Sequence, residues 1–375
     1  FIVDDLQVDI TEMNLDPDEI ETVTVIRDIL GKAMYGPQAA DGIIYIKTKH
    51  GNASKRLIQV NAENGVSMVD RFPQWVSGGD YARLNNMARE NSGMSPLYEP
   101  SDIAAYAKND PYNLYHPSIN FRNMLLKDSR SFTRVNVSAG GGSDDVQYYA
   151  YVGYNGEGDI YKLGSTADYN RINARSNIDL RITDDLKVSL GIYGGISIRR
   201  SPNYGYYTAE TSSEFSLLGM NSMLDEITSI PPVAFPVFAA YNEDDDIPWY
   251  GVSSTFGSNP VGNLEGNGYH SESTRSSAAN IAIDYDLSAF IPGLKSRTYA
   301  TFNILNLVRL GKAENYIAYT ATPSTTAGGK DTIILAKVHD GIDMADQARL
   351  HDYYYQRLAI YESLSYEKSF GGHDL

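Results

Sequence analysis

The fold is decided by the stretch DPDEIETVTVIRD, residues 16–28 of the chain. Its first four residues supply a helix cap, a proline suited to the first helical position and a glutamate that can complete a capping box. The β-branched run that follows predicts a strand over 22–27, and a second strand is predicted over 43–49. A short helix over 28–36 would lie between them, capped by the aspartate and ended by a glycine. The pattern predicts a compact βαβ-like module.

This order of residues resembles the plug domain of the SusC/RagA family of TonB-linked outer-membrane transporters. The family carries an Ile-Glu opening, a hydrophobic strand ending Lys-Asp, an Ala-rich helix, Tyr-Gly, and Asn-Gly-Val-Ile running into Thr-Lys and Gly. The sequence departs from the family at 29–32, where the usual small residues are absent, and at 3–8, which lack the family's Gly and Pro. The matching positions are Ile20-Glu21, Val25-Ile26-Arg27-Asp28, Ala33-Met34-Tyr35-Gly36, Ala40-Asp41-Gly42-Ile43-Ile44, Thr48-Lys49 and Gly51.

Composition favours a barrel for the rest of the 375 residues. Tyr at 29 outnumbers Phe at 11, and 32 glycines suit turns and a wet lumen. No run approaches the roughly 18 apolar residues of a transmembrane helix, so any membrane span must consist of strands. The absence of cysteine fits an exported protein without disulfides.

The net charge of −16 argues against nucleic acid as a partner, because such binding needs a basic face. The acid is concentrated in apparent loops, notably at 243–246. These aspartates could offer oxygens to calcium, but the spacing of a calcium loop is missing. We therefore interpret 243–246 as a solvated external loop and expect no metal site.

Strands are indicated by strict alternation of apolar and polar residues over ten or more positions. A soluble β-sandwich would alternate as well. Strand length and rows of Arg, Asn and Asp on the polar side favour a transmembrane antiparallel barrel with a water-filled lumen. We expect Ile172, Ile178, Leu180, Val188, Leu190 and Ile192 to face lipid, and Arg171, Arg175 and Arg181 to face the lumen.

Connection lengths set the topology, because bacterial barrels have short periplasmic turns and long external loops. Long connections are expected at 71–130, with a short helix over 78–89, and at 156–169, 200–272 and 310–346. Short turns, at 140–145, 183–186, 289–294 and 370–374, interleave with them. The prediction is an all-β fold with about 8 of about 22 barrel strands and an α/β plug segment. Residues 1–52 would be the C-terminal part of the plug and 53–375 the N-terminal part of the barrel.

The chain opens inside a strand-like segment, without a signal peptide or a TonB box, and stops in a turn-like one. We therefore expect an internal fragment of a longer protein.

No pattern for catalysis survives inspection. The six histidines are scattered without ligand spacing and there is no cysteine. The three glycines at 140–142 precede a strand and lack the ending of a phosphate loop, so they indicate a hairpin turn. We expect no enzyme activity, no catalytic residue and no cofactor.

Aromatic residues gather in the longest predicted external loop, where they could stack on sugar rings or pack a peptide. Loop self-packing and contact with a lid protein stay open as alternatives. The candidate substrate- or partner-contacting residues are Tyr204, Tyr206, Tyr207, Trp249 and Tyr250.

The resemblance implies TonB-dependent import of a large nutrient, an oligosaccharide or oligopeptide, across the outer membrane of a Bacteroidetes-like Gram-negative bacterium. It also implies a SusD-like surface lipoprotein, outer-membrane lipid, and TonB with ExbB–ExbD as partners. One rival is a siderophore- or cobalamin-type receptor. Another is a surface adhesin or a loop-borne enzyme on a barrel.

Overall fold

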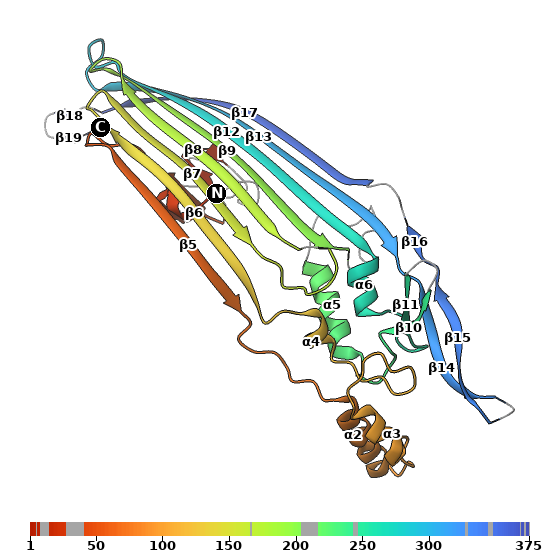
Figure 1. Ribbon diagram of the computed structural model, residues 1–375. Coiled ribbons are helices and arrows are strands. Elements are labelled where there is room, and N and C mark those ends of the chain that lie inside the picture. Colours follow the sequence, from red (N-terminus) through yellow and green to blue (C-terminus); the bar gives the residue numbers. More distant parts are fainter. Residues whose placement is uncertain are drawn as a thin grey trace.

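Figure 1 shows a computed structural model of the chain, in which one large sheet carries a small N-terminal sheet at one face and helices at one end. The small sheet lies toward the end of the strands opposite to the helices. The structure describes residues 1–4, 6–7, 15–27, 41–165, 167–203, 217–242, 247–326, 329–343, 348–367, 369–370 and 373–374.

The large sheet is an antiparallel meander in which strands adjacent in sequence pair with each other, and only β16 and β17 depart from this order by both pairing with β13. This is the antiparallel architecture predicted for a partial transmembrane barrel. Eight of its nine strands are long, as the alternation predicted. They are β5 (Leu57–Met68), β6 (Ser129–Gly142), β7 (Val146–Glu157), β8 (Tyr169–Arg181), β9 (Leu186–Pro202), β12 (Gly268–Asp286), β13 (Leu294–Asn315) and β17 (Ala348–Tyr366), and the short one is β16 (Ile342–Asp343).

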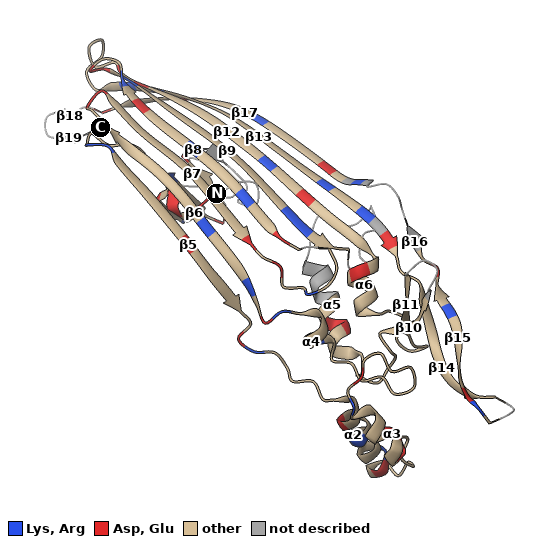
Figure 2. Cartoon of the chain, in the orientation of Figure 1, with Lys and Arg blue, Asp and Glu red and all other residues tan. Residues whose placement is uncertain are grey.

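The two faces of this sheet differ in what covers them. On β9, Ile192 is 51% exposed and its neighbour Tyr193 only 3%. On β8, Ile172 is exposed whereas Asn173 and Arg175 are buried. We call the side of Ile192 the apolar face and the side of Arg175 the polar face. Charged residues recur along the strands in Figure 2, and alternation assigns each to one face.

The remaining lipid-face candidates, Ile178, Leu180, Val188 and Leu190, are half-buried and share the apolar face by alternation. Arg171 is half-buried on the polar face. Arg181 shares that face but is exposed, because β8 ends there at a short turn. The predicted phase of the strands is therefore the one that the structure has.

The long connections are more structured than predicted. The expected helix over 78–89 is present as α2 (Gly78–Asn91). A second sheet of order β10-β11-β14-β15 was not predicted. Its members are β10 (Phe238–Asn242), β11 (Ile247–Val252), β14 (Ala318–Thr325) and β15 (Asp331–His339). The other α-helices of the described residues are α3 (Pro100–Tyr106), α4 (Phe121–Leu125), α5 (Leu217–Ser229) and α6 (Pro260–Gly266).

The N-terminal sheet has the order β2-β1-β4-β3. The predicted βαβ-like arrangement is corrected, because β3 and β4 are antiparallel neighbours and a βαβ unit has parallel strands. The parallel partner of β4 is β1 instead. The helix predicted over 28–36 lies outside the described residues. The strands are β1 (Ile2–Val3), β2 (Leu6–Gln7), β3 (Ile20–Ile26) and β4 (Ile43–Thr48).

The predicted capping box is present at the helical turn η1 (Pro17–Glu19). The backbone N–H of Asp18 donates to Asp16 Oδ1 at 3.0 Å, and that of Asp16 donates to Glu19 Oε1 at 3.4 Å. At the other end of the chain, β18 (Ser369–Phe370) and β19 (His373–Asp374) pair antiparallel, as the turn predicted there requires.

Among the described residues, no helix has both the length and the apolar composition needed to cross a membrane.

Ile192→Arg is expected to impair assembly into the membrane, because Arg on the lipid face costs about 2–4 kcal/mol at the bilayer midplane. Ser189→Arg places the same charge on the polar face of the same strand, where Ser189 contacts Asp179, and should assemble normally. The heat-modifiable folded band on a gel of outer-membrane fractions measures both. Equal assembly of the two variants would contradict the assignment of the faces.

Candidate functional site

The N-terminal sheet is held on the polar face of the large sheet by buried charges. Asp16 and Glu19, the two members of the capping box, are 1% and 0% exposed. Arg175 Nε donates to Glu19 Oε2 at 2.7 Å, and Arg171 Nη2 donates to Asp16 Oδ2 at 3.2 Å. The carboxylates that shape the helical turn therefore also bind two arginines of β8. We call this group the carboxylate latch.

Further polar contacts surround the latch. Arg175 Nη1 also donates to Asp4 Oδ2 at 3.4 Å, and Thr48 donates to Asp4 through both its backbone N–H and its hydroxyl. Asn173 donates to Glu19, and the hydroxyl of Tyr299 on β13 donates to the backbone carbonyl of Asp4. A buried carboxylate needs such partners to offset the loss of water. These contacts join the segment after β1 and the helical turn before β3 to the large sheet, and Thr48 of β4 is linked to them through Asp4.

A second group of contacts fixes the segment that leaves β4. Asn177 Nδ2 donates to the hydroxyl of Thr48 at 2.9 Å and to the carbonyl of Lys49 at 2.8 Å. His50 Nδ1 lies 2.8 Å from Asp179 Oδ2. At Gly51, a Cβ would lie 2.3 Å from the backbone nitrogen of Tyr148 on β7, so only glycine fits there. We call these contacts the linker anchor.

The charge state of Glu19 in the latch depends on Arg175. Burial raises the pKa of Glu19 above its ordinary value of 4.5, and the guanidinium of Arg175 opposes this shift by favouring the carboxylate. Removing the arginine would remove this opposition and raise the pKa of Glu19 further.

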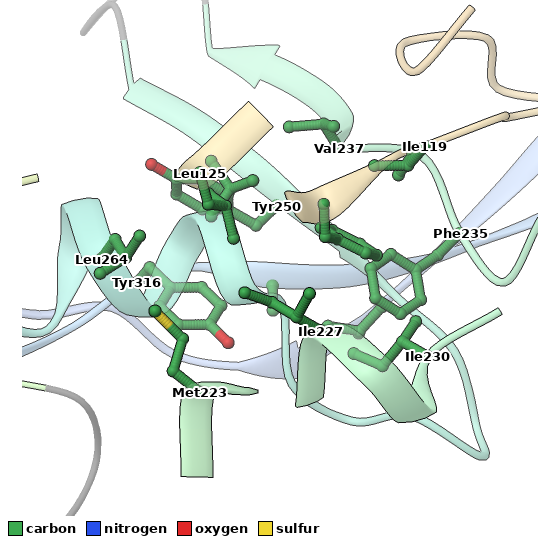
Figure 3. Close-up of a cluster of buried hydrophobic side chains, with 14 of the residues drawn as sticks. Ile119, Leu125, Met223, Ile227, Ile230, Phe235, Val237, Tyr250, Leu264 and Tyr316 are labelled. Atoms are coloured by element: carbon green, nitrogen blue, oxygen red, sulfur yellow. The ribbon is translucent and has the colours of Figure 1, made fainter. Parts of the chain in front are cut away.

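At the far end of the large sheet lies an apolar cluster from α4, α5, α6, the second sheet and the segments between them, shown in Figure 3. Tyr250 and Tyr316 meet there edge to face, with ring centroids 5.1 Å apart. Asn259 is fully buried and links two segments of the cluster by donating to the carbonyls of Val237 and Gly251 at 3.1 and 2.8 Å. The cluster comprises Ile119, Phe121, Leu125, Leu126, Met223, Ile227, Ile230, Phe235, Val237, Tyr250, Val252, Val261, Leu264, Tyr316 and Ala318.

Of the five residues predicted to contact substrate or a partner, one is buried, one is half-buried and three lie outside the described residues. Tyr250 is 5% exposed and packs in this cluster, and its hydroxyl donates to Glu265 Oε2 at 2.8 Å. Burial and the neighbouring Glu265 raise its pKa. This is the self-packing that the sequence left open. Trp249 is half-buried and stacks on Tyr319, with centroids 4.6 Å apart. Tyr204, Tyr206 and Tyr207 lie outside the described residues, as do the acidic residues 243–246.

Within the described part of the chain, no group of three or more His, Asp or Glu side chains is arranged to hold a metal ion. Several histidines there lie against other polar groups. His116 lies 3.0 Å from Asp102, and His270 Nε2 lies 2.9 Å from Asn203 Oδ1.

Comparison with known proteins agrees with this architecture, although no family model matches the chain. TonB-dependent receptor P3 of Formosa agariphila is 24% identical over 364 residues, which is 96% of this chain and 30% of the relative. TonB-dependent receptor SusC of Bacteroides thetaiotaomicron is 25% identical over 165 residues, 44% of this chain and 14% of SusC. The chain is similar to the SusC/RagA family of TonB-dependent receptors. It spans less than a third of the length of these receptors.

Solved structures of the RagAB transporter share the fold. The RagAB peptide transporter superimposes with a TM-score of 0.61 at 16% identity, covering 97% of this chain and 47% of that one. The RagAB importer in its "closed-closed" state gives 0.58 at 20% identity, covering 83% and 35%. The proteins to which this chain is similar are thus named as receptors and transporters, and none of these names denotes an enzyme.

Arg175→Met is expected to weaken docking of the N-terminal sheet by about 3–5 kcal/mol, because it leaves buried carboxylates unpaired. Arg134→Met is the matched control, since Arg134 forms a more exposed pair with Glu63 at 3.8 Å and should change docking by less than about 1 kcal/mol. Hydrogen exchange of the β3 and β4 amides measures docking. Equal exchange in the two variants would contradict the role of the latch.

The Arg175→Met defect should shrink in acid. Without Arg175, the pKa of docked Glu19 rises further above its undocked value, so the contribution of Glu19 to docking is fully present below pH 4.5 and is lost as the pH rises through the docked pKa. Exchange of the same amides at about pH 4 and about pH 7 measures this. A defect of the same size at both pH values would show that Glu19 is not the group affected.

Proposed function

We propose that this SusC/RagA-like chain is the plug-and-barrel part of a TonB-dependent importer of a large nutrient, an oligosaccharide or oligopeptide, in a Bacteroidetes-like outer membrane. The observation that carries the proposal is the carboxylate latch, a polar contact between a small sheet and the lumen side of a barrel wall. An apolar contact between the two sheets would suit a permanent core. The charges of the latch can instead be solvated by a water-filled lumen when the two sheets separate.

The domain division follows from this proposal. Residues 1–52 form the C-terminal part of the plug, and 53–375 the N-terminal part of the barrel, with extracellular loops at 71–130, 156–169, 200–272 and 310–346. This division is supported by the strand pairing: in the described residues, no strand of the N-terminal sheet pairs with a strand of the large sheet. The helices gather at the end opposite to the short turns, where extracellular loops belong.

Import needs mechanical work, because the latch must open before a large substrate can pass. In the proposed cycle, substrate binds at the end of the barrel that carries the long extracellular loops, which we call the loop end. TonB, energised by ExbB–ExbD, then pulls on the plug. The latch opens while the linker anchor keeps the plug attached to the wall. A SusD-like lipoprotein would close over the loop end, and the packed cluster around Tyr316 gives that lid a firm base.

The substrate contact is proposed for the stacked pair Trp249 and Tyr319, because its aromatic faces lie on the second sheet at the loop end. Replacing both by Ala should lower substrate affinity about tenfold, the loss of roughly 1–2 kcal/mol typical of an aromatic contact. Phe290→Ala is the control, since Phe290 is an exposed aromatic in a short turn at the opposite end. Uptake of labelled oligosaccharide and oligopeptide measures the effect. Unchanged uptake in the double variant would remove the pair from the substrate path.

The importer class is tested by deleting the gene and purifying the tagged protein with its partners. Copurification of a SusD-like lipoprotein and loss of oligosaccharide or oligopeptide uptake are the expected results. Loss of siderophore or cobalamin uptake without such a lipoprotein would favour the other receptor class. Surface binding or turnover that survives removal of the plug, with uptake intact, would favour an adhesin or enzyme.

A further inference from the structure

A single arginine stands out on the apolar face of β12. Along this strand Ile281, Ile283 and Tyr285 are exposed, whereas Ala282 is buried toward the polar face. Arg275 lies an even number of positions from these exposed residues, so it shares their face of the strand, and it is itself exposed. It therefore points away from the lumen, on the side where a barrel meets lipid.

The depth of Arg275 follows from the length of the strand. From Tyr285 to Arg275 the strand has about 11 residues, and a tilted strand needs about 9–11 to cross the bilayer. Tyr285 lies near the short turn at 287–293, where an aromatic residue marks one membrane boundary. Arg275 consequently lies at the other boundary, on the side of the long loops.

The neighbours of Arg275 across the sheet form a polar row at the same boundary. Arg275 is directly opposite Asn306 on β13, and Asn306 is opposite Tyr354 on β17. Tyr354 is exposed, and its hydroxyl donates to Gln356 Oε1 at 3.0 Å. On the other side of Arg275 lies the exposed Ile196 of β9. We call Arg275, Asn306 and Tyr354 the boundary row.

The charge of Arg275 is not neutralised by an ion pair within the described residues. One carboxylate lies close by in the register, Asp352, but it is already engaged by Arg349 Nη1 at 2.6 Å and by Asn306 Nδ2 at 3.4 Å. A guanidinium at a membrane boundary is matched best by a phosphate group, which it can bind through two parallel hydrogen bonds. Asn306 retains a second N–H for the same anion.

We propose that the boundary row binds the phosphorylated sugar headgroup of an outer-leaflet glycolipid. Arg275 pairs with the phosphate, Asn306 donates to it, and the ring of Tyr354 packs at the level of the headgroups. The inference rests on the proposed outer-membrane orientation, which places the long loops outside. It assigns to this part of the wall a fixed lipid, separate from the import pathway in the lumen.

The test is native mass spectrometry of the purified protein in detergent, titrated with diphosphorylated lipid A or with the same lipid dephosphorylated. The unchanged protein should bind the phosphorylated lipid about tenfold more tightly. Arg275→Gln should abolish that difference and Arg275→Lys should retain part of it. Arg83→Gln removes an exposed charge on α2 and should behave as the unchanged protein. The heat-modifiable band verifies that each variant is folded.

Three results would overturn the proposal. They are equal binding of the two lipids, undiminished binding by Arg275→Gln, and displacement of the lipid by excess inorganic phosphate, which would assign the row to free phosphate. The readout is lipid retained by the purified protein and involves no transport. A failure of the import proposal would appear in uptake assays instead, so the two outcomes are distinguishable.

Discussion

The buried pair of Glu19 and Arg175 is the interaction on which the arrangement of the two sheets depends. Glu19 is held in place by the helical turn that it ends and by its capping box with Asp16, and Arg175 is held by its position on the polar face of β8. In the docked arrangement neither charge is accessible to water, so docking is stable only while the two charges are paired. A turn built from acidic residues and a strand lined with arginines therefore specify how the small sheet sits on the wall.

Much of this architecture is readable from the sequence because strands in a barrel obey a period of two. The alternation around Ile172 and Arg175 gives the strands and their faces, since one face meets an apolar environment and the other a polar one. The capping box at Asp16 is readable for a similar reason, because a local hydrogen-bond pattern needs only neighbouring residues.

Other features are not readable because they depend on residues far apart in the chain. The pairing of Glu19 with Arg175 bridges 156 positions, and nothing local distinguishes Arg175 from the other arginines of β8. The second sheet, of β10, β11, β14 and β15, is formed by two different long connections, so neither connection alone predicts it. The self-packing of Tyr250 likewise depends on Glu265 and Tyr316, which lie in separate elements.

The chain segment that joins the N-terminal sheet to the large sheet also limits how far the N-terminal sheet can travel. Between the end of β4 at Thr48 and the start of β5 at Leu57 the chain has room for about 30 Å when fully stretched. That is about the thickness of the hydrocarbon core of a bilayer. An N-terminal sheet released from every noncovalent contact would thus remain within about one membrane thickness of its docked position, so it could rebind after a short diffusive search.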